Sequence, residues 1–243
     1  MNMYLDIVSA KQKGVKLLAV LIDPEKTDLK HLPSFLEKIH QSITTHIFVG
    51  GSTDQNNQIE LVVQAIKKYS QLPVVLFPGS EAQITEVADA LLFLSLVSGR
   101  NPEYLIGQHV KAAEKLRQTS LEVIPTGYLL IDGDTETSVQ RVSETKPIAQ
   151  NQINEIVSTA LASQLLGQKL VYLEAGSGAK TPASFELIQA VKEALSIPLI
   201  VGGGIRNKEQ LQQAFDAGAD MTVIGTAFEQ DISFFDELKK ETF

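Results

Sequence analysis

A single carboxylate, that of Glu174, stands between a short apolar run and a turn made of small residues. The whole stretch reads Tyr172, Leu173, Glu174, Ala175, Gly176, Ser177 and Gly178. Two later stretches have the same form, with aliphatic residues followed by Gly203 and Gly204, and by Gly225 and Thr226. Glycine lets a backbone approach an anion closely, and the start of a helix favours negative charge. The three turns in series therefore predict one phosphate site that faces a carboxylate.

The position of Glu174, directly after the apolar residues of an expected buried strand, indicates acid–base chemistry. Burial disfavours an ionised carboxylate and raises its pKa toward the range in which it is an effective general base. A structural ion pair with a nearby cation, Lys180 or Arg206, is the alternative, and the sequence leaves it open.

A second carboxylate, Asp23, follows the first expected strand, and Ser52 follows the second. Mg²⁺ prefers one or two carboxylates together with the phosphate oxygens of a substrate. Asp23 is therefore a candidate Mg²⁺ ligand, with Ser52 completing its shell, although Asp followed by Pro is also typical of a turn and a helix cap. Arg100 follows the fourth strand. Its planar guanidinium can bind phosphate oxygens, so Arg100 is a candidate pyrophosphate contact, with plain surface solvation as the alternative.

Apolar runs that alternate with segments of helical period must position these side chains. Strands are expected over 16–22, 46–49, 74–77, 90–94, 121–131, 170–173, 198–201 and 221–224. Helices are expected over 4–13, 32–42, 59–69, 102–118, 154–166, 182–195, 208–217 and 228–240. This alternation, without a break in composition, predicts a single-domain α/β protein over residues 1–243, a parallel (β/α)8 TIM barrel whose functional residues lie at the carboxyl ends of the strands. A doubly wound open sheet is the lesser alternative.

Two segments depart from the regular alternation. Residues 81–89 are too few for a full helix and two turns, so the third helix is expected to be short or replaced by a loop. Residues 135–150 are polar and lack a clear period. Because long loops in compact domains are often functional, we expect this segment to form an ordered excursion over the barrel mouth.

The composition excludes several classes of protein. The 243 residues carry a formal net charge of −8 without a cluster of Lys and Arg, so nucleic acid is not expected as a partner. There is no Cys, which excludes disulfides, thiolate catalysis and Cys-ligated zinc. No apolar run reaches the roughly 18 residues of a membrane span and no signal peptide is evident, so a cytoplasmic protein is expected. Barrels of this size often self-associate, and we expect a homo-oligomer.

Seven segments together resemble one family, the geranylgeranylglyceryl phosphate synthases, which includes the heptaprenylglyceryl phosphate synthases. The segments are 21–26 (LIDPEK), 48–52 (FVGGS), 76–80 (LFPGS), 98–102 (SGRNP), 125–128 (PTGY), 172–178 (YLEAGSG) and 201–206 (VGGGIR). The resemblance runs from the first expected strand to Gly225 and Thr226, which is nearly the whole chain.

That resemblance implies a prenyltransferase of ether lipid biosynthesis, which joins sn-glycerol 1-phosphate to a polyprenyl diphosphate such as geranylgeranyl diphosphate and releases pyrophosphate. It implies that Asp23 and Ser52 bind Mg²⁺ and that Glu174 takes the proton from the attacking hydroxyl. The residues implied for glycerol 1-phosphate are Tyr172, Leu173, Glu174, Ala175, Gly176, Ser177, Gly178, Gly203, Gly204, Gly225 and Thr226.

One position departs from the family pattern. Some members carry a lysine two positions before the metal aspartate as a phosphate contact, whereas this chain has Leu21 there. The chain therefore resembles the branch that lacks the first-strand lysine, and the contact to pyrophosphate is left between Arg100 and Lys26.

The prenyl tail requires an apolar trough, which we expect beside the reduced third helix and residues 92–94. A lipid product also implies a transient contact with a membrane surface. Two other functions stay open. A phosphosugar isomerase would use Asp23 and Asp132, at the ends of the first and fifth strands, as its acid–base pair. A non-catalytic phosphometabolite-binding protein would keep the phosphate turns without turnover.

Overall fold

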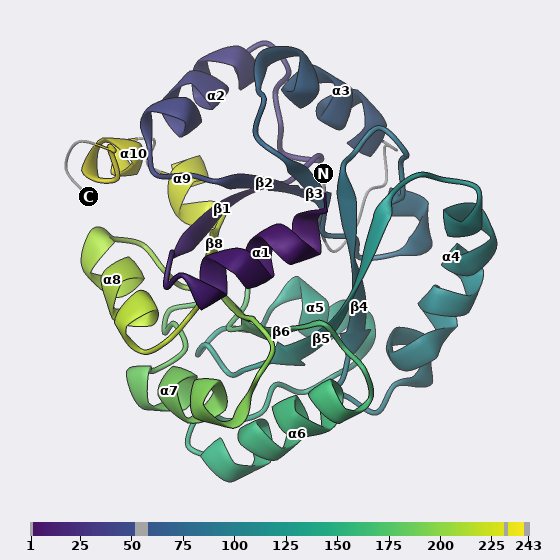
Figure 1. Cartoon of the computed structure of the whole chain (residues 1–243), viewed down its shortest axis with the longest axis vertical. Coiled ribbons are helices and arrows are strands. Elements are labelled where there is room, and N and C mark those ends of the chain that lie inside the picture. The colour runs from purple at the N-terminus through teal and green to yellow at the C-terminus, as the bar shows by residue number, and fades with distance from the viewer. Residues whose placement is uncertain (1, 52–57, 231–232, 241–243) are drawn as a thin grey trace.

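The computed structural model describes residues 2–51, 58–230 and 233–240. Within them, eight parallel strands follow the order of the sequence around a closed barrel, and β8 pairs with β1 to close it (Figure 1). The strands are β1 Leu17–Ile22, β2 His46–Val49, β3 Val74–Leu76, β4 Ala90–Leu96, β5 Glu122–Leu130, β6 Leu170–Glu174, β7 Leu199–Gly202 and β8 Met221–Ile224. The prediction of a TIM barrel is confirmed.

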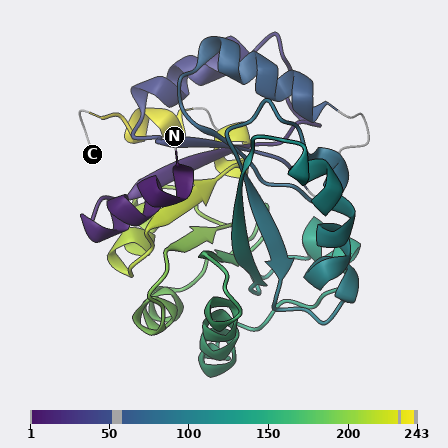
Figure 2. The same ribbon diagram turned by 45° about the vertical axis from the view of Figure 1, so that its right-hand side comes forward.

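The helices mostly surround the strands on the outside of the barrel, but the first one lies across an end of the barrel (Figures 1 and 2). They are α1 Met3–Gln12, α2 Leu32–Gln41, α3 Ile59–Tyr69, α4 Gln108–Arg117, α5 Ser138–Ser143, α6 Ile153–Leu165, α7 Phe185–Ala194, α8 Lys208–Asp216, α9 Thr226–Gln230 and α10 Phe234–Glu237, with a 3-10 turn η1 Glu81–Gln83 and a π-helix η2 Glu103–Gly107. None of the helices in the described parts of the chain is both long and apolar enough to cross a lipid bilayer.

The connection between β3 and β4 contains only the short turn η1, as the length of the segment predicts. The expected helix over 228–240, by contrast, is wrong, because the chain forms two short helices, α9 and α10. The rings of Phe228 and Phe235 stack with centroids 3.9 Å apart. In one continuous helix, residues seven apart would lie about 10 Å apart along the axis. The chain therefore folds back so that these two rings can meet.

The inside of the barrel is apolar and is closed at its N-terminal end by α1. Met3 and Ile7 of α1 are buried among inward-facing strand residues such as Leu170 and Tyr172. The carboxylate of Glu122, at the start of β5, accepts hydrogen bonds from the first backbone N–H groups of α1 and so fixes its position. Figure 1 shows α1 lying across the strands. Only the opposite end, at the carboxyl ends of the strands, is left for a ligand.

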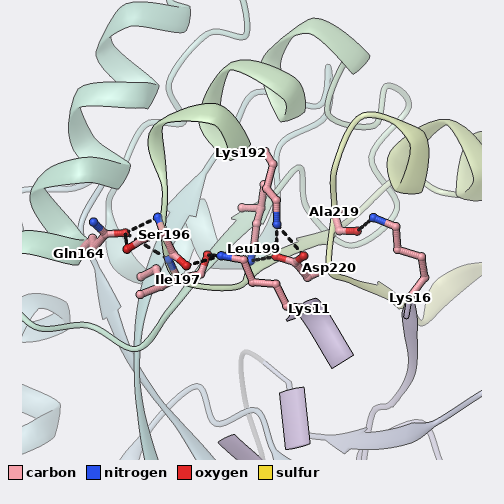
Figure 3. A network of polar contacts seen from close by, with 9 residues as sticks. All are labelled: Lys11, Lys16, Gln164, Lys192, Ser196, Ile197, Leu199, Ala219 and Asp220. Atoms are coloured by element: carbon pink, nitrogen blue, oxygen red, sulfur yellow. Dashed lines mark hydrogen bonds and ion pairs between the residues drawn. The ribbon is translucent and has the colours of Figure 1, made fainter. Parts of the chain in front are cut away.

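A polar network next to α1 holds β7 and β8 in place (Figure 3). The buried carboxylate of Asp220 receives both a 2.6 Å ion pair from Lys192 and a 2.9 Å hydrogen bond from the backbone N–H of Leu199. Lys16 donates to a carbonyl just before β8, and Lys11 of α1 donates to carbonyls in the loop before β7. In this class of barrel the N-terminal face serves stability. The network thus supports the end of the barrel that faces away from the predicted site.

Candidate active site

A cavity of about 250 Å³ opens at the carboxyl ends of the strands. It is bordered by residues of seven strand ends and of the segment that contains α5. The lining residues with predicted or newly apparent roles are Leu21, Asp23, Lys26, Gly51, Phe77, Tyr128, Thr137, Ser138, Val139, Tyr172, Glu174, Gly176, Ser177, Gly178, Gly203, Gly204, Arg206, Gly225 and Thr226. Most of the residues predicted to bind substrate therefore do line one cavity. Leu173 and Ala175 are buried behind its wall.

The three glycine turns after β6, β7 and β8 lie against one another. The hydroxyl of Ser177, after β6, is 2.9 Å from that of Thr226, after β8. Gly203, after β7, has a φ of +85°, and a Cβ atom there would lie only 2.5 Å from the backbone nitrogen of Gly176 and 2.6 Å from Oε1 of Glu174. Only glycine is compatible with both its conformation and this close approach. The predicted convergence of the three turns is present in the structure.

Glu174 ends β6 and points into the barrel, where its side chain is almost completely buried. Its Oε1 accepts a 2.7 Å hydrogen bond from the backbone N–H of Gly176. Burial raises the pKa of Glu174 to about 7, although the hydrogen bond from Gly176 and the nearby hydroxyl of Tyr172 oppose this shift. Among the described residues Glu174 forms no ion pair, so the alternative of a structural pair with Lys180 or Arg206 is wrong.

An aromatic floor lies directly below Glu174. The ring of Tyr172 stacks on that of Phe77 with centroids 5.3 Å apart and meets Tyr128 at 5.4 Å. These three side chains fill the barrel beneath the carboxylate, which explains why it is shielded from water. Burial, together with the charge of Glu174, raises the pKa of both tyrosine hydroxyls, which therefore stay protonated.

Asp23 lies at the rim of the same cavity, and its side chain is partly exposed. Its Oδ1 accepts a hydrogen bond from the backbone N–H of Glu25, and its Oδ2 is 3.3 Å from Nζ of Lys26. Gly51 lies beside it, and a Cβ atom at that position would be 3.3 Å from Oδ1. Glycine therefore keeps the space next to the carboxylate open. Ser52, the second predicted metal ligand, lies outside the described residues.

The structure does not bring Arg100 to this cavity. Its guanidinium donates to the carbonyls of Val97 and Gly99, in its own loop, at 3.3 and 2.7 Å. It borders a separate surface hollow together with Lys146. Lys26, in contrast, lines the main cavity from beyond Asp23, and Leu21 occupies the wall at the position of the lysine that is absent here.

The polar segment after β5 covers one side of the cavity, as its length and composition predict. Thr137, at the start of α5, packs so closely on the turn after β6 that a Cβ atom on Gly176 would lie 2.1 Å from its methyl group. Gly176 has a φ of +107°. The sequence assigned no role to Thr137, Phe77 or Tyr128. The last two fall within the LFPGS and PTGY motifs, and alternation along the strands was the only signal that pointed them inward.

A second cavity adjoins the first on the side of β3 and β4. The two share Gly51, Phe77, Tyr128 and Val139 in their walls. The remaining wall is mostly apolar and includes Ile84, Leu91, Leu92, Phe93, Leu94, Leu96, Tyr104, Ala112 and Val142. This cavity lies where the third helix is reduced to η1, next to residues 92–94. An apolar cavity is therefore present at the position that the sequence predicts for a trough.

Together these features define a class of protein: a TIM barrel in which three glycine turns converge after β6, β7 and β8, with a buried carboxylate beside them and an adjoining apolar cavity. The family model described as the PcrB family matches residues 10–242, and the chain belongs to this family. Geranylgeranylglyceryl phosphate synthase of Zunongwangia profunda is 59% identical over 223 residues, which cover 92% of this chain and 95% of that protein. That of Thermococcus gammatolerans is 43% identical over 225 residues, 92% and 88% of the two chains.

A solved structure is similar over almost the whole chain. It is that of (S)-3-O-geranylgeranylglyceryl phosphate synthase from Thermoplasma acidophilum in complex with its substrate sn-glycerol-1-phosphate. The two chains are 37% identical and superimpose with a TM-score of 0.92, over 98% of this chain and 96% of the other. The match in sequence and fold therefore extends from the first strand to the last helices.

The raised pKa of Glu174 predicts that replacing this residue with Gln stabilises the protein in a pH-dependent manner. A carboxyl group with a pKa of about 7 when folded and 4.5 ordinarily binds its proton more tightly in the folded state. The folded protein is therefore destabilised as the pH rises from 4.5, the ordinary pKa, through about 7, the pKa in the folded state. Glu174→Gln should raise the free energy of unfolding by about 3 kcal/mol at pH 8 and by less than about 1 kcal/mol at pH 5.

Urea unfolding at the two pH values measures this difference. The matched control is Glu186→Gln, at an exposed position in the first turn of α7. An equal effect of Glu174→Gln at pH 5 and pH 8 would show that the carboxyl group is not perturbed by burial.

Proposed function

We propose that this protein is a Mg²⁺-dependent prenyltransferase that forms the ether bond between sn-glycerol 1-phosphate and a polyprenyl diphosphate, with geranylgeranyl diphosphate as the first candidate, in ether lipid biosynthesis. The names of the relatives and the bound substrate of the Thermoplasma structure support this assignment. The observation that supports it best is that the buried Glu174 lines one cavity together with the three glycine turns, and that an apolar cavity adjoins it.

The phosphate of sn-glycerol 1-phosphate fits the convergence of the three glycine turns. Backbone N–H groups in such turns and at helix starts bind anions without a charged side chain. Ser177 and Thr226 add two hydroxyls at the edge of the cradle. With the phosphate there, the three-carbon backbone of the substrate extends toward Glu174, and its far hydroxyl meets the carboxylate.

Glu174 then acts as the general base. Its ionised form takes the proton of the C3 hydroxyl, and the oxygen attacks the first carbon of the prenyl chain. The bond from that carbon to the diphosphate oxygen breaks, and pyrophosphate leaves with the electron pair. The product is the ether, and the proton stays on Glu174 until solvent removes it. A pKa of about 7 makes the ionised form available near neutral pH while keeping it basic enough to accept a proton.

The surroundings of Asp23 are compatible with Mg²⁺. Within the described chain no group of three or more His, Cys, Asp or Glu side chains could hold a metal ion. A cation at Asp23 would be held by this carboxylate and by diphosphate oxygens, a ligand set that Mg²⁺ accepts, and Glu25 lines the same cavity. Gly51 leaves the space beside Oδ1 open, and Ser52 follows it in sequence. When bound, Mg²⁺ would neutralise the charge that develops on the leaving pyrophosphate.

The apolar cavity suits the prenyl chain. Its wall is formed by aliphatic and aromatic side chains, and it meets the phosphate-binding cavity at Phe77 and Tyr128. The diphosphate end would thus lie near Asp23 and the hydrocarbon between β3, β4 and α4. Because Lys26 lines the cavity and Arg100 does not, Lys26 is the proposed contact to the diphosphate. The expected homo-oligomer and the contact with a membrane surface stay predictions.

The phosphosugar isomerase alternative requires Asp23 and Asp132 to face one ligand. The carboxylate of Asp132 instead accepts a hydrogen bond from the backbone N–H of Asp134 and does not border the cavity that contains Asp23. The geometry therefore favours the prenyltransferase. A non-catalytic binding protein would bind glycerol phosphate and form no product.

The decisive test of function combines sn-glycerol 1-phosphate, Mg²⁺ and a ladder of prenyl diphosphates, with ether products and pyrophosphate read by mass spectrometry. The wild-type protein should form an ether, and Glu174→Gln should lower turnover by about 10²- to 10⁴-fold, because it removes the general base. Binding of glycerol phosphate by calorimetry should be nearly unchanged. Binding without product in the wild type would instead support the non-catalytic alternative.

Asp23→Asn should weaken the binding of Mg²⁺ and so raise the Mg²⁺ requirement. Loss of the Asp23 carboxylate should raise the Mg²⁺ concentration for half-maximal activity by roughly tenfold or more. Asp28→Asn, at an exposed position nearby, is the control. Metal titrations that coincide for wild type and Asp23→Asn would exclude Asp23 as a ligand.

Two neighbouring alanines on α4 test the position of the prenyl chain. Ala112 is buried in the wall of the apolar cavity, whereas Ala113 is exposed on the outer face of the helix. Ala112→Leu narrows the cavity and should shift the preference toward shorter prenyl diphosphates by about tenfold in kcat/KM, whereas Ala113→Leu should not. The proposed binding region is wrong if both variants keep the wild-type preference.

A further inference from the structure

Arg206, after β7, lines the cavity and is hydrogen-bonded to the turn after β6. Its Nη2 donates to the carbonyls of Gly178 and Ala179, at 3.2 and 2.7 Å. Both distances lie within the range of good hydrogen bonds, and the donor is permanently charged. The guanidinium therefore links the loop after β7 to the loop after β6 through backbone atoms rather than through another side chain.

The two carbonyls that Arg206 contacts belong to the peptide groups between Gly178 and Ala179 and between Ala179 and Lys180. The N–H of each of these peptide groups is also hydrogen-bonded. The N–H of Ala179, which belongs to the peptide of the Gly178 carbonyl, donates to the carbonyl of Gly176 at 3.1 Å. The N–H of Lys180, in the next peptide, donates to the carbonyl of Gly133 at 2.9 Å. Because a peptide is planar and trans, bonding both its carbonyl and its N–H fixes its orientation. Each of these two successive peptide groups is thus hydrogen-bonded at both its carbonyl and its N–H.

This double attachment determines the shape of the turn between Gly176 and Ala179. Gly176 and Gly178 both have positive φ values, +107° and +74°. Glycine also adopts many other backbone conformations at little cost. Without attachments, the turn would sample many conformations. The tip of the turn, Ser177 and Gly178, lines the cavity. The carbonyl of Gly133 holds the turn on the side of β5, and Arg206 on the side of β7.

We infer that Arg206 is a positioning residue for the phosphate of the substrate: it fixes the Gly176–Ala179 turn in its anion-binding conformation before the ligand arrives. The inference rests on the proposed function for the identity of the substrate, but the preorganised turn is a property of the protein alone. Preorganisation lowers the ordering cost of binding, so its loss weakens ligand affinity more than it slows the chemical step. The effect should be confined to sn-glycerol 1-phosphate, the substrate whose phosphate is proposed to bind at this turn.

The test compares Arg206→Met and Arg206→Lys with Arg117→Met, which removes a surface arginine on α4. Arg206→Met keeps much of the apolar stem but removes the donors. It should raise the KM for sn-glycerol 1-phosphate by about tenfold or more, change kcat by less than about threefold, and leave the KM for prenyl diphosphate unchanged. Arg206→Lys, which keeps a charged donor, should recover part of the lost affinity. Arg117→Met should match the wild type throughout.

Two readouts without turnover separate this inference from the proposed function. In the free protein, amide hydrogen exchange in residues 176–181 should be faster in Arg206→Met than in wild type, with the rest of the barrel unchanged. Binding of inorganic phosphate, measured by calorimetry, should weaken in parallel. If affinity falls while exchange in the turn stays at the wild-type rate, Arg206 contacts the phosphate directly and the positioning role is overturned.

A positioning role is likewise overturned if Arg206→Met and Arg206→Lys both bind inorganic phosphate as the wild type does. If the exchange and phosphate results are as expected but the wild type forms no ether product, the inference stands and the proposed prenyltransferase activity fails. Should Arg206→Met not fold, Arg206→Lys carries the same comparison with a smaller expected effect.

Discussion

A carboxylate buried beside three converging glycine turns is the constraint on which the rest of this structure depends. Glu174 lies inside the barrel, has one hydrogen bond from Gly176, and has a pKa raised by the loss of hydration. Its ionised form is disfavoured there because of this burial. Such a group destabilises the folded protein near neutral pH, and that destabilisation is what makes it basic enough for proton transfer.

The packing of the rest of the molecule offsets the free-energy cost of burying the Glu174 carboxylate. The N-terminal end of the barrel is closed by α1 and by the network around Asp220, so the barrel opens at one end only. Beneath Glu174, Tyr172, Tyr128 and Phe77 fill the interior and exclude water. The reduction of the third helix to η1 provides the adjoining apolar cavity. Acid–base chemistry and the apolar cavity are thereby placed next to each other.

Local features of this arrangement could be predicted from the sequence, because their causes are local. Apolar runs gave the eight strands, the shortness of residues 81–89 gave the reduced third helix, and the position of Glu174 at a strand end gave its inward direction. Features set by tertiary contacts could not. The stacking of Phe228 on Phe235 divides the last helix, and the guanidinium of Arg100 turns back to its own loop. The close contacts of Thr137 and Arg206 with the turn after β6 join segments far apart in the sequence.

The protonation state of Glu174 in the free protein is the most direct measure of this constraint. It can be followed by titrating the carboxyl carbon of Glu174 by NMR in protein labelled with ¹³C at glutamate carboxyl groups, with the signal identified by its absence in Glu174→Gln. A midpoint near pH 7 is the predicted result. A midpoint near 4.5, the ordinary value for glutamate, would contradict a desolvated carboxylate and with it the role of Glu174 as the general base.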